Sequence, residues 1–141
     1  MGDRMEIRSD DATRTILIVD DVEYTAEALE LALSGIRDVI VRAVHSAADA
    51  IRILDDWRER VGVVVTDIRM PVMDGFDLIQ FIRAHRRYSA TPIVVVTADT
   101  DPGTPERTSR LGANAFFSKP FSPIAVRRTL ENLLYAKPDS A

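Results

Sequence analysis

Apolar residues along the chain alternate between short continuous runs and longer segments with helical periodicity. The runs predict five strands, over residues 15–19, 39–44, 61–66, 92–96 and 115–118. Three runs, 16–19, 63–65 and 93–96, are apolar at every position, which is typical of parallel strands covered on both faces. A helix-length segment follows each run. The pattern therefore predicts an α/β fold of five strand-helix units around a mostly parallel sheet.

Polar residues mark where the predicted helices begin and end. Capping side chains precede four of the helices, at Ser46, Asp74, Thr104 and Ser122. Glycines stand where the first and fourth helices should end, at Gly35 and Gly112. The last helix is predicted to run from Pro123 to about Tyr135. No internal repeat or linker interrupts this order.

Composition narrows the class of protein. The 141 residues are 46% hydrophobic, enough for one domain core, which we place at 15–136 between a leader (1–14) and a tail (137–141). The net charge of −4 and the lack of a basic run argue against direct binding to nucleic acid. Without cysteine, disulfides and thiol catalysis are excluded. The charged first residues and the absence of a long apolar segment predict a cytoplasmic protein with no membrane partner.

Polar side chains follow four of the predicted strands at the point where each strand ends. Asp20 and Asp21 follow the first, Asp67 the third, Thr97 the fourth and Lys119 the fifth. Taken singly, each is a common turn or cap residue. Because ligands of open parallel sheets bind outside the carboxyl ends of the strands, we expect these side chains to share one crevice.

Three carboxylates in one crevice require a neutralising partner. Two like charges about 4 Å apart repel by roughly 4 kcal/mol at an effective dielectric constant near 20. Carboxylate oxygens without histidine or cysteine favour Mg²⁺, or Mn²⁺. Such sites hold the metal through few carboxylates together with water and phosphate oxygens, so a phosphoryl group is the expected remaining ligand.

Lys119 stands out because basic residues in this chain are nearly all arginine. Of the 18 basic residues only Lys119 and Lys137 are lysine. A compact ammonium reaches a phosphate or a carboxylate in a tight pocket where a planar guanidinium does not fit. Pro120 follows, and a cis Lys119-Pro120 peptide is predicted to aim the side chain inward.

Taken together, these motifs resemble the receiver domain of two-component response regulators. The matching stretches are ILIVDD at 16–21, VVVTDIRMPVMDG at 63–75, IVVVTA at 93–98 and GANAFFSKPF at 112–121. The resemblance covers residue 15 to about residue 135. It implies a flavodoxin-like (βα)5 three-layer sandwich with strand order 2-1-3-4-5. It also implies phosphorylation of an aspartate by a sensor histidine kinase or a histidine phosphotransfer protein.

The resemblance gives each matched position a role. Asp67 corresponds to the phosphoacceptor, Thr97 to the residue that hydrogen-bonds the phosphoryl group, and Lys119 to the cation that pairs with it. Phe116 occupies the aromatic switch position, although it lacks the hydroxyl that many receivers have there. The expected ligands of Mg²⁺ are Asp20, Asp21, Asp67 and the backbone carbonyl of Arg69. Phosphoryl transfer needs an in-line nucleophile and neutralised phosphoryl oxygens, which this set can supply.

The implied switch links the phosphoryl group to a distant surface. Thr97 would move toward the phosphoryl group and Phe116 would turn inward, which changes the face formed by the fourth helix, fifth strand and fifth helix. In the family this face dimerises or docks a target protein or output domain. The expected function is that of a phosphorelay receiver, stand-alone or part of a larger regulator, which catalyses only its own phosphotransfer and dephosphorylation.

Two alternatives remain open from the residues. One is a receiver-like interaction module that does not use phosphate. The other is a Mg²⁺-dependent phosphohydrolase, disfavoured because Arg69 stands where a second acid is needed two residues after Asp67.

Several further side chains carry hypotheses of their own. Arg69 and Asp99 are predicted to pair across the mouth of the site and restrict water. His45 and His85 lack acidic partners at the spacing of metal ligands and are expected at the surface. Trp57 is expected on a helix, lying on apolar surface. Basic side chains could also line the face of the fourth and fifth helices: Arg107, Arg110, Arg127 and Arg128.

Overall fold

The computed structural model describes residues 13–135. Five strands alternate with five helices along the chain: β1 (Arg14–Val19), α2 (Glu23–Leu33), β2 (Val39–Val44), α3 (Ala47–Leu54), β3 (Val61–Thr66), α4 (Gly75–Ala84), β4 (Ile93–Thr97), α5 (Thr104–Leu111), β5 (Ala115–Ser118) and α6 (Pro123–Tyr135). The predicted tail (137–141) and residues 1–12 of the predicted leader lie outside the described residues. Within the described residues no helix is long and apolar enough to cross a membrane.

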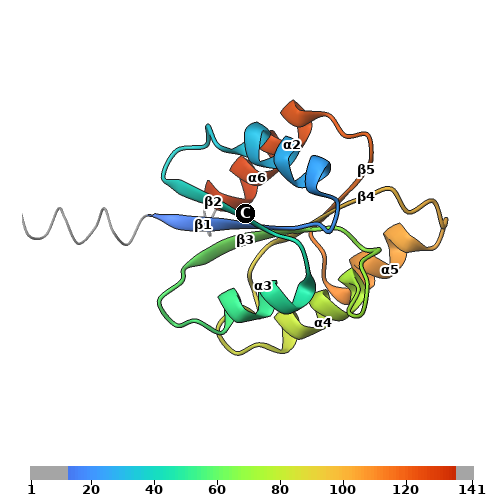
Figure 1. Ribbon diagram of the computed structural model, residues 1–141, viewed down its shortest axis with the longest axis horizontal. Coiled ribbons are helices and arrows are strands. Elements are labelled where there is room, and N and C mark those ends of the chain that lie inside the picture. Colours follow the sequence, from blue (N-terminus) through green and yellow to red (C-terminus); the bar gives the residue numbers. More distant parts are fainter. Residues whose placement is uncertain (1–12, 136–141) are drawn as a thin grey trace, which may run out of the picture.

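The strands form one parallel sheet of order β2-β1-β3-β4-β5. Helices α2 and α6 cover one face of the sheet and α3, α4 and α5 cover the other (Figure 1). The predicted three-layer fold and strand order are thereby confirmed. Because all strands are parallel, their carboxyl ends lie along one side of the sheet and their amino ends along the opposite side. These two sides are called the carboxyl edge and the amino edge.

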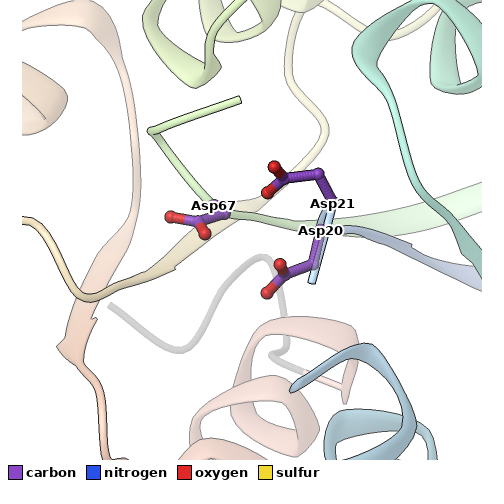
Figure 2. A group of neighbouring side chains, drawn as sticks. All are labelled: Asp20, Asp21 and Asp67. Atoms are coloured by element: carbon purple, nitrogen blue, oxygen red, sulfur yellow. The ribbon is translucent and has the colours of Figure 1, made fainter. Parts of the chain in front are cut away.

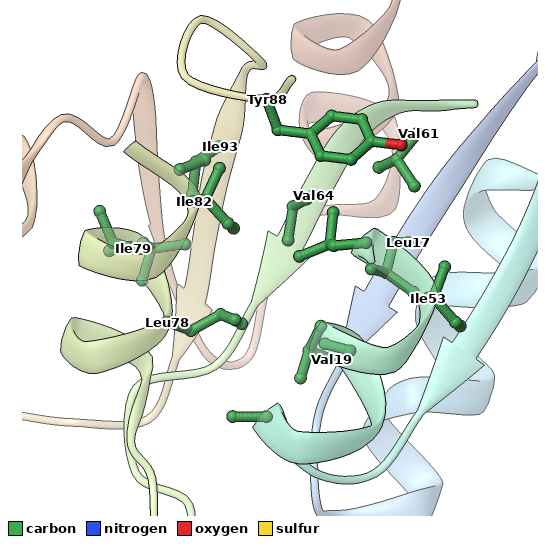
Figure 3. Packing of buried hydrophobic residues seen from close by; sticks show 14 of the residues in the cluster. Leu17, Val19, Ile53, Val61, Val64, Leu78, Ile79, Ile82, Tyr88 and Ile93 are labelled. Atoms are coloured by element: carbon green, nitrogen blue, oxygen red, sulfur yellow. The ribbon is translucent and has the colours of Figure 1, made fainter. Parts of the chain in front are cut away.

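Alternate residues of the central strands enter two separate cores. Ile16 and Ile18 of β1 pack with α2 and α6. Leu17 and Val19 of the same strand pack against α3 and α4, together with Val64 of β3 (Figure 3). Each fully buried aliphatic side chain contributes about 1.5–3 kcal/mol. The continuous apolar runs are therefore explained by the burial of both faces of the strands.

Three strand ends differ from the prediction by one residue, and one of them is the start of β4, which lies at Ile93 instead of residue 92. β1 begins at Arg14, one residue earlier, because Arg14 pairs with Val39 of β2. β4 extends to Thr97, which pairs with Ser118 of β5. Thr97 is therefore the last residue of the strand and is fully buried, so its backbone position is fixed by the sheet.

Three of the four predicted caps form hydrogen bonds to helix N–H groups. Ser46 accepts from Asp49, Ser122 accepts from Ala125, and Asp74 forms a reciprocal capping box with the residue three positions later. The prediction for Thr104 is wrong, because its hydroxyl donates to the Asp99 carboxylate at 2.8 Å. The N-cap of α5 is the preceding glycine instead.

The two predicted glycine stops differ in backbone geometry. Gly112 ends α5 in the left-handed conformation, with φ of 114°. Gly35 follows the C-cap residue Ser34 of α2 and is not left-handed.

The expectation that Trp57 packs on a helix is also wrong. α3 ends at Leu54, and Trp57 lies in the following turn with 79% of its surface exposed. The Asp56 carboxylate accepts a hydrogen bond from the backbone N–H of Arg58 at 3.0 Å. This local side-chain bond competes with helix continuation, as aspartate often does in turns.

Candidate functional site

The carboxyl ends of β1 and β3 bring three acidic side chains together. One carboxylate oxygen from each of Asp20, Asp21 and Asp67 lies within 4.8 Å of the others (Figure 2). Asp20 and Asp67 are buried, whereas Asp21 is exposed. The neighbouring positions of β1 and β3 in the sheet produce this convergence.

Lys119 joins this group from the end of β5. Its Nζ lies 2.9 Å from Oδ2 of Asp20 and 3.0 Å from Oδ2 of Asp67. The side chain of Lys119 is 14% exposed, so the ammonium is held inside the pocket. The peptide bond between Lys119 and Pro120 is cis.

Backbone N–H groups bind the remaining oxygens of the two buried carboxylates. Oδ1 of Asp20 accepts from Val22 N–H at 2.9 Å, and Oδ1 of Asp67 accepts from Ile68 N–H at 2.6 Å. Each carboxylate is therefore fixed between a backbone donor and the lysine. The Asp67 side chain remains 6% exposed, so it is recessed but not sealed from solvent.

Gly75 is a supporting residue that the sequence analysis includes only as the last residue of the stretch 63–75. A Cβ at this position would lie 2.2 Å from the backbone carbonyl oxygen of Asp67 and 2.8 Å from the Cα of Ile68. Any side chain would therefore push the start of α4 away from the end of β3. In the sequence, the Asp74-Gly75 pair is typical of a turn. The contact that requires glycine is made with Asp67 and Ile68, which lie at the other end of the loop between β3 and α4.

Burial and charge act in opposite directions on the two buried ionisable groups. Burial raises the pKa of Asp20, and hydrogen bonds from Val22 and Lys119 only partly oppose this effect. Burial alone would lower the pKa of Lys119, but its bonds to Asp20 and Asp67 outweigh it and raise the pKa above the ordinary value. Lysine therefore remains an ammonium at neutral pH.

The pocket suits a divalent cation. With all groups ionised, three carboxylates and one ammonium sum to a charge of −2, which one divalent ion would balance. The donor atoms are hard oxygens, as Mg²⁺ prefers. Two ligands at about 2.1 Å from one ion lie at most about 4.2 Å apart, so oxygens within 4.8 Å of one another need at most a small inward movement to share an ion. The acidic cluster therefore fits the predicted metal, with Asp21 as its most accessible member.

Thr97 and Phe116 lie beside the acidic cluster rather than in it. The Thr97 hydroxyl accepts a hydrogen bond from the N–H of Asp99 at 3.2 Å. Thr97, Phe116 and Lys119 line one hollow of about 310 Å³, so the predicted phosphate-binding and switch residues face a shared space. Within the described residues, Thr97 makes no hydrogen bond to Asp67.

The predicted pair between Arg69 and Asp99 is present. Nη2 of Arg69 lies 2.9 Å from Oδ2 of Asp99, and the Arg69 side chain is largely exposed. The pKa of Asp99 is lowered, first by the N–H of Asp101, then by the Thr104 hydroxyl and by Arg69. Thr104 thus helps to hold Asp99 at the mouth of the site. The sequence did not indicate this role, because a threonine before a proline is typical of a helix cap.

The two histidines differ from one another. His45 is exposed as expected, and its Nδ1 donates to the backbone carbonyl of Asp20 at 3.0 Å. His85 is only partly at the surface, with 19% of its side chain exposed, because its ring packs beside Phe81 and Tyr88 and its Nε2 lies 3.2 Å from the Asp55 carboxylate. Asp55 is 30 residues away in the sequence, whereas Phe81 on α4 and Tyr88 in the following turn are close neighbours of His85.

The arginines expected on the face of α5 and α6 are mostly engaged within the fold. Arg107 stacks on the Phe76 ring at 3.7 Å from its centroid. Arg110 pairs with Glu106, and Arg127 pairs with Glu131 and donates to the Gly35 carbonyl. The carboxylates of Glu106 and Glu131 therefore offset two of the four charges, whereas Arg107 and the exposed Arg128 keep theirs.

The sequence matches one protein family and is similar to named bacterial proteins. The family described as "Response regulator receiver domain" matches residues 16–131. The chain is 36% identical to the transcriptional regulatory protein GltR of Pseudomonas aeruginosa over 86% of its length, and it spans about half of that relative (49%). It is 30% identical to a chemotaxis protein CheY homolog of Campylobacter jejuni, covering 84% of this chain and 91% of the relative.

Solved structures agree in fold. A response regulator receiver protein from Pseudomonas putida aligns with a TM-score of 0.77 at 33% identity, covering 86% of this chain and 98% of that one. A second, described as a response regulator from Chloroflexus aurantiacus, aligns with a TM-score of 0.77 at 32% identity over 86% of this chain and 98% of its own.

Proposed function

Since the chain belongs to the response regulator receiver domain family, which acts in two-component signalling, we propose that it accepts a phosphoryl group on Asp67. The donor in this proposal is a phosphohistidine of a sensor histidine kinase or a histidine phosphotransfer protein. An oxygen of the Asp67 carboxylate attacks phosphorus, the phosphorus–nitrogen bond of the donor breaks, and the released imidazole takes up a proton.

The observation that carries the proposal is the position of Lys119 between two buried carboxylates. Its ammonium lies 3.0 Å from Asp67 and 2.9 Å from Asp20, so a positive charge is already placed where phosphoryl oxygens would arrive. Preorganised charge of this kind stabilises a transferring phosphoryl group without further rearrangement.

Mg²⁺ is the proposed cofactor, held by Asp20, Asp21, Asp67 and the backbone carbonyl of Arg69. When bound, it would neutralise phosphoryl oxygens. The two buried acids keep their orientation through backbone hydrogen bonds, and the exposed Asp21 gives the ion access from solvent.

The proposed switch starts at Thr97. Its hydroxyl, which now accepts from Asp99 N–H, turns to donate to the phosphoryl group. Phe116 lines the hollow beside Thr97 and moves into the space that is vacated. The surface of α5, β5 and α6 then changes, and a target protein, an output domain or a second copy of the chain binds it. In this proposal the protein is a cytoplasmic signalling receiver and not an enzyme with a separate substrate.

The experiment is incubation of the protein with acetyl phosphate and Mg²⁺, followed by intact-mass measurement. We expect a gain of one phosphoryl mass in the wild type and none in Asp67→Asn. The matched control is Asp38→Asn, an exposed acid directly before β2 and so at the opposite side of the sheet, which should react like the wild type.

Other outcomes point to the alternatives. No gain of mass in the wild type would contradict the proposal and favour an interaction module that does not use phosphate. Rapid turnover of assorted phosphate esters would favour a phosphohydrolase.

A further inference from the structure

A second pocket lies at the amino edge of the sheet, opposite the edge that carries Asp67. Its volume is about 340 Å³, and its lining residues are Arg14, Arg60, Val61, Arg87, Tyr88 and Thr91. They come from the start of β1, the start of β3 and the loop between α4 and β4. Half of the lining residues are arginine and none is acidic.

Two of these guanidinium groups are held in place by neutral partners. Arg87 donates to the backbone carbonyls of Trp57 and Glu59 at 2.9 Å and 2.5 Å, and it stacks over the Tyr88 ring. Such bonds fix the orientation of the group without cancelling its charge. Each guanidinium has five N–H donors, so several remain for a ligand.

Arg14 is held in the same way. Its Nη2 donates to the carbonyl of Leu134 at 2.7 Å, and its guanidinium lies over the Tyr135 ring. The side chain is therefore oriented before any ligand arrives, which reduces the conformational entropy that binding must overcome.

The acids that lie closest in sequence to the lining residues at the start of β3 are paired with other cations. Glu59 pairs with Arg42 at 2.6 Å, and Asp56 pairs with Arg58 at 3.1 Å. Among residues 13–135, no ion pair joins a carboxylate to Arg14 or Arg87. The pocket thus gathers positive charge in a chain whose net charge is −4.

We propose that this pocket binds the phosphate group of a small organic phosphate. Guanidinium groups match phosphate oxygens with paired, charge-assisted hydrogen bonds. Arg14 and Arg87 come from separate segments of the chain and, with the Thr91 hydroxyl beside them, can approach a ligand from different directions. That arrangement suits a tetrahedral oxyanion with three or more free oxygens better than a carboxylate with two. The volume leaves room for a group attached to the phosphate.

The test is titration of the full chain with inorganic pyrophosphate, without Mg²⁺ and at constant ionic strength, followed by amide chemical shifts in NMR spectra. We expect saturable shifts at Arg60, Arg87 and Thr91. The variant Arg87→Gln should bind about tenfold more weakly, the size of one charge-assisted hydrogen bond. Arg128→Gln is the matched control, because Arg128 is exposed on α6 away from the lining residues, and its affinity should stay within twofold.

Three results would overturn the proposal. Shifts centred on Lys119 and Thr97 would show that pyrophosphate binds at the acidic pocket instead. Equal weakening by Arg87→Gln and Arg128→Gln would reveal only a general attraction between pyrophosphate and positive charge. Tricarballylate binding as tightly as pyrophosphate would contradict the preference for phosphate. Thr91→Val, which removes one hydroxyl and leaves the guanidinium contacts in place, should weaken pyrophosphate binding if the pocket is the site.

Discussion

The two edges of the sheet carry opposite charges. At each edge, backbone groups of the opposite polarity bind the charged side chains. At the carboxyl edge, buried acids accept hydrogen bonds from N–H groups such as that of Val22 at the start of α2. At the amino edge, arginines donate to carbonyl groups such as that of Leu134 at the end of α6. Helix N-termini carry partial positive charge and helix C-termini partial negative charge.

Because every strand is parallel and every helix returns antiparallel to it, all helix N-termini face one edge and all C-termini the other. The fold alone therefore favours acids at one edge and arginines at the other. The two groups of charges differ in burial. Asp20 and Asp67 are buried beside a cation, which is unusual for acids, whereas the arginines that line the amino-edge pocket are mostly exposed. A charged cluster at a sheet edge indicates chemistry most strongly when its members are also desolvated.

The largest expected effect is at the amino edge. Arg83 donates to the carbonyls of Gly112 and Thr91 at 2.7 Å each, and burial lowers its pKa. Arg83→Ala should destabilise the protein by about 3 kcal/mol, because several carbonyls lose a charged donor. Urea unfolding measures this, with Arg86→Ala as an exposed control within about 0.5 kcal/mol of the wild type. Equal effects of the two substitutions would show that the carbonyls do not need the guanidinium.

A smaller effect is expected at the carboxyl edge, where burial raises the pKa of Asp20 above its ordinary value of 3.8. The folded state therefore binds the proton more tightly than the unfolded state, so ionised Asp20 reduces stability. Without metal, Asp20→Asn should be more stable than the wild type at neutral pH by about 1 kcal/mol.

The advantage of Asp20→Asn should shrink as the pH falls through the raised pKa toward 3.8, because the wild-type acid then becomes neutral as well. Urea unfolding of both proteins across this pH range, in the presence of a chelator, measures the difference. A constant or growing difference at lower pH would contradict the desolvation of Asp20.

The smallest effect is expected at the mouth of the carboxyl edge. Arg69 and Asp99 form an exposed pair, and such pairs contribute about 0.2–1 kcal/mol. If the pair restricts water, Arg69→Ala and Asp99→Ala should each lose the acyl phosphate about two- to threefold faster. Arg110→Ala, which breaks an exposed pair on α5, is the control. Unchanged dephosphorylation rates in both variants would end the hypothesis.

Much of the fold could be predicted from the sequence because its signals are local. The apolar runs of β1, β3 and β4 require burial on both faces, and Ser46, Asp74 and Ser122 cap helices through neighbours three residues away. The same holds for the acids and the lysine, since residues that end parallel strands must meet at one edge.

The remaining features depend on contacts between distant segments. Thr104 looks like a cap in sequence, but the Asp99 carboxylate competes for its hydroxyl. His85 finds Asp55 only after α3 and α4 pack side by side. Gly75 is required by the backbone of Asp67 and Ile68, just after β3, and a local sequence pattern cannot reveal this contact.

The location of the phosphoryl group tests the central claim most directly. After reaction with acetyl phosphate and Mg²⁺, borohydride reduces an aspartyl phosphate to homoserine, which peptide mass spectrometry can locate. We predict homoserine at position 67 alone, in the peptide that also contains Ile68. Homoserine at position 20 or 21, or at no aspartate in phosphorylated protein, would contradict the assignment of Asp67 as the acceptor.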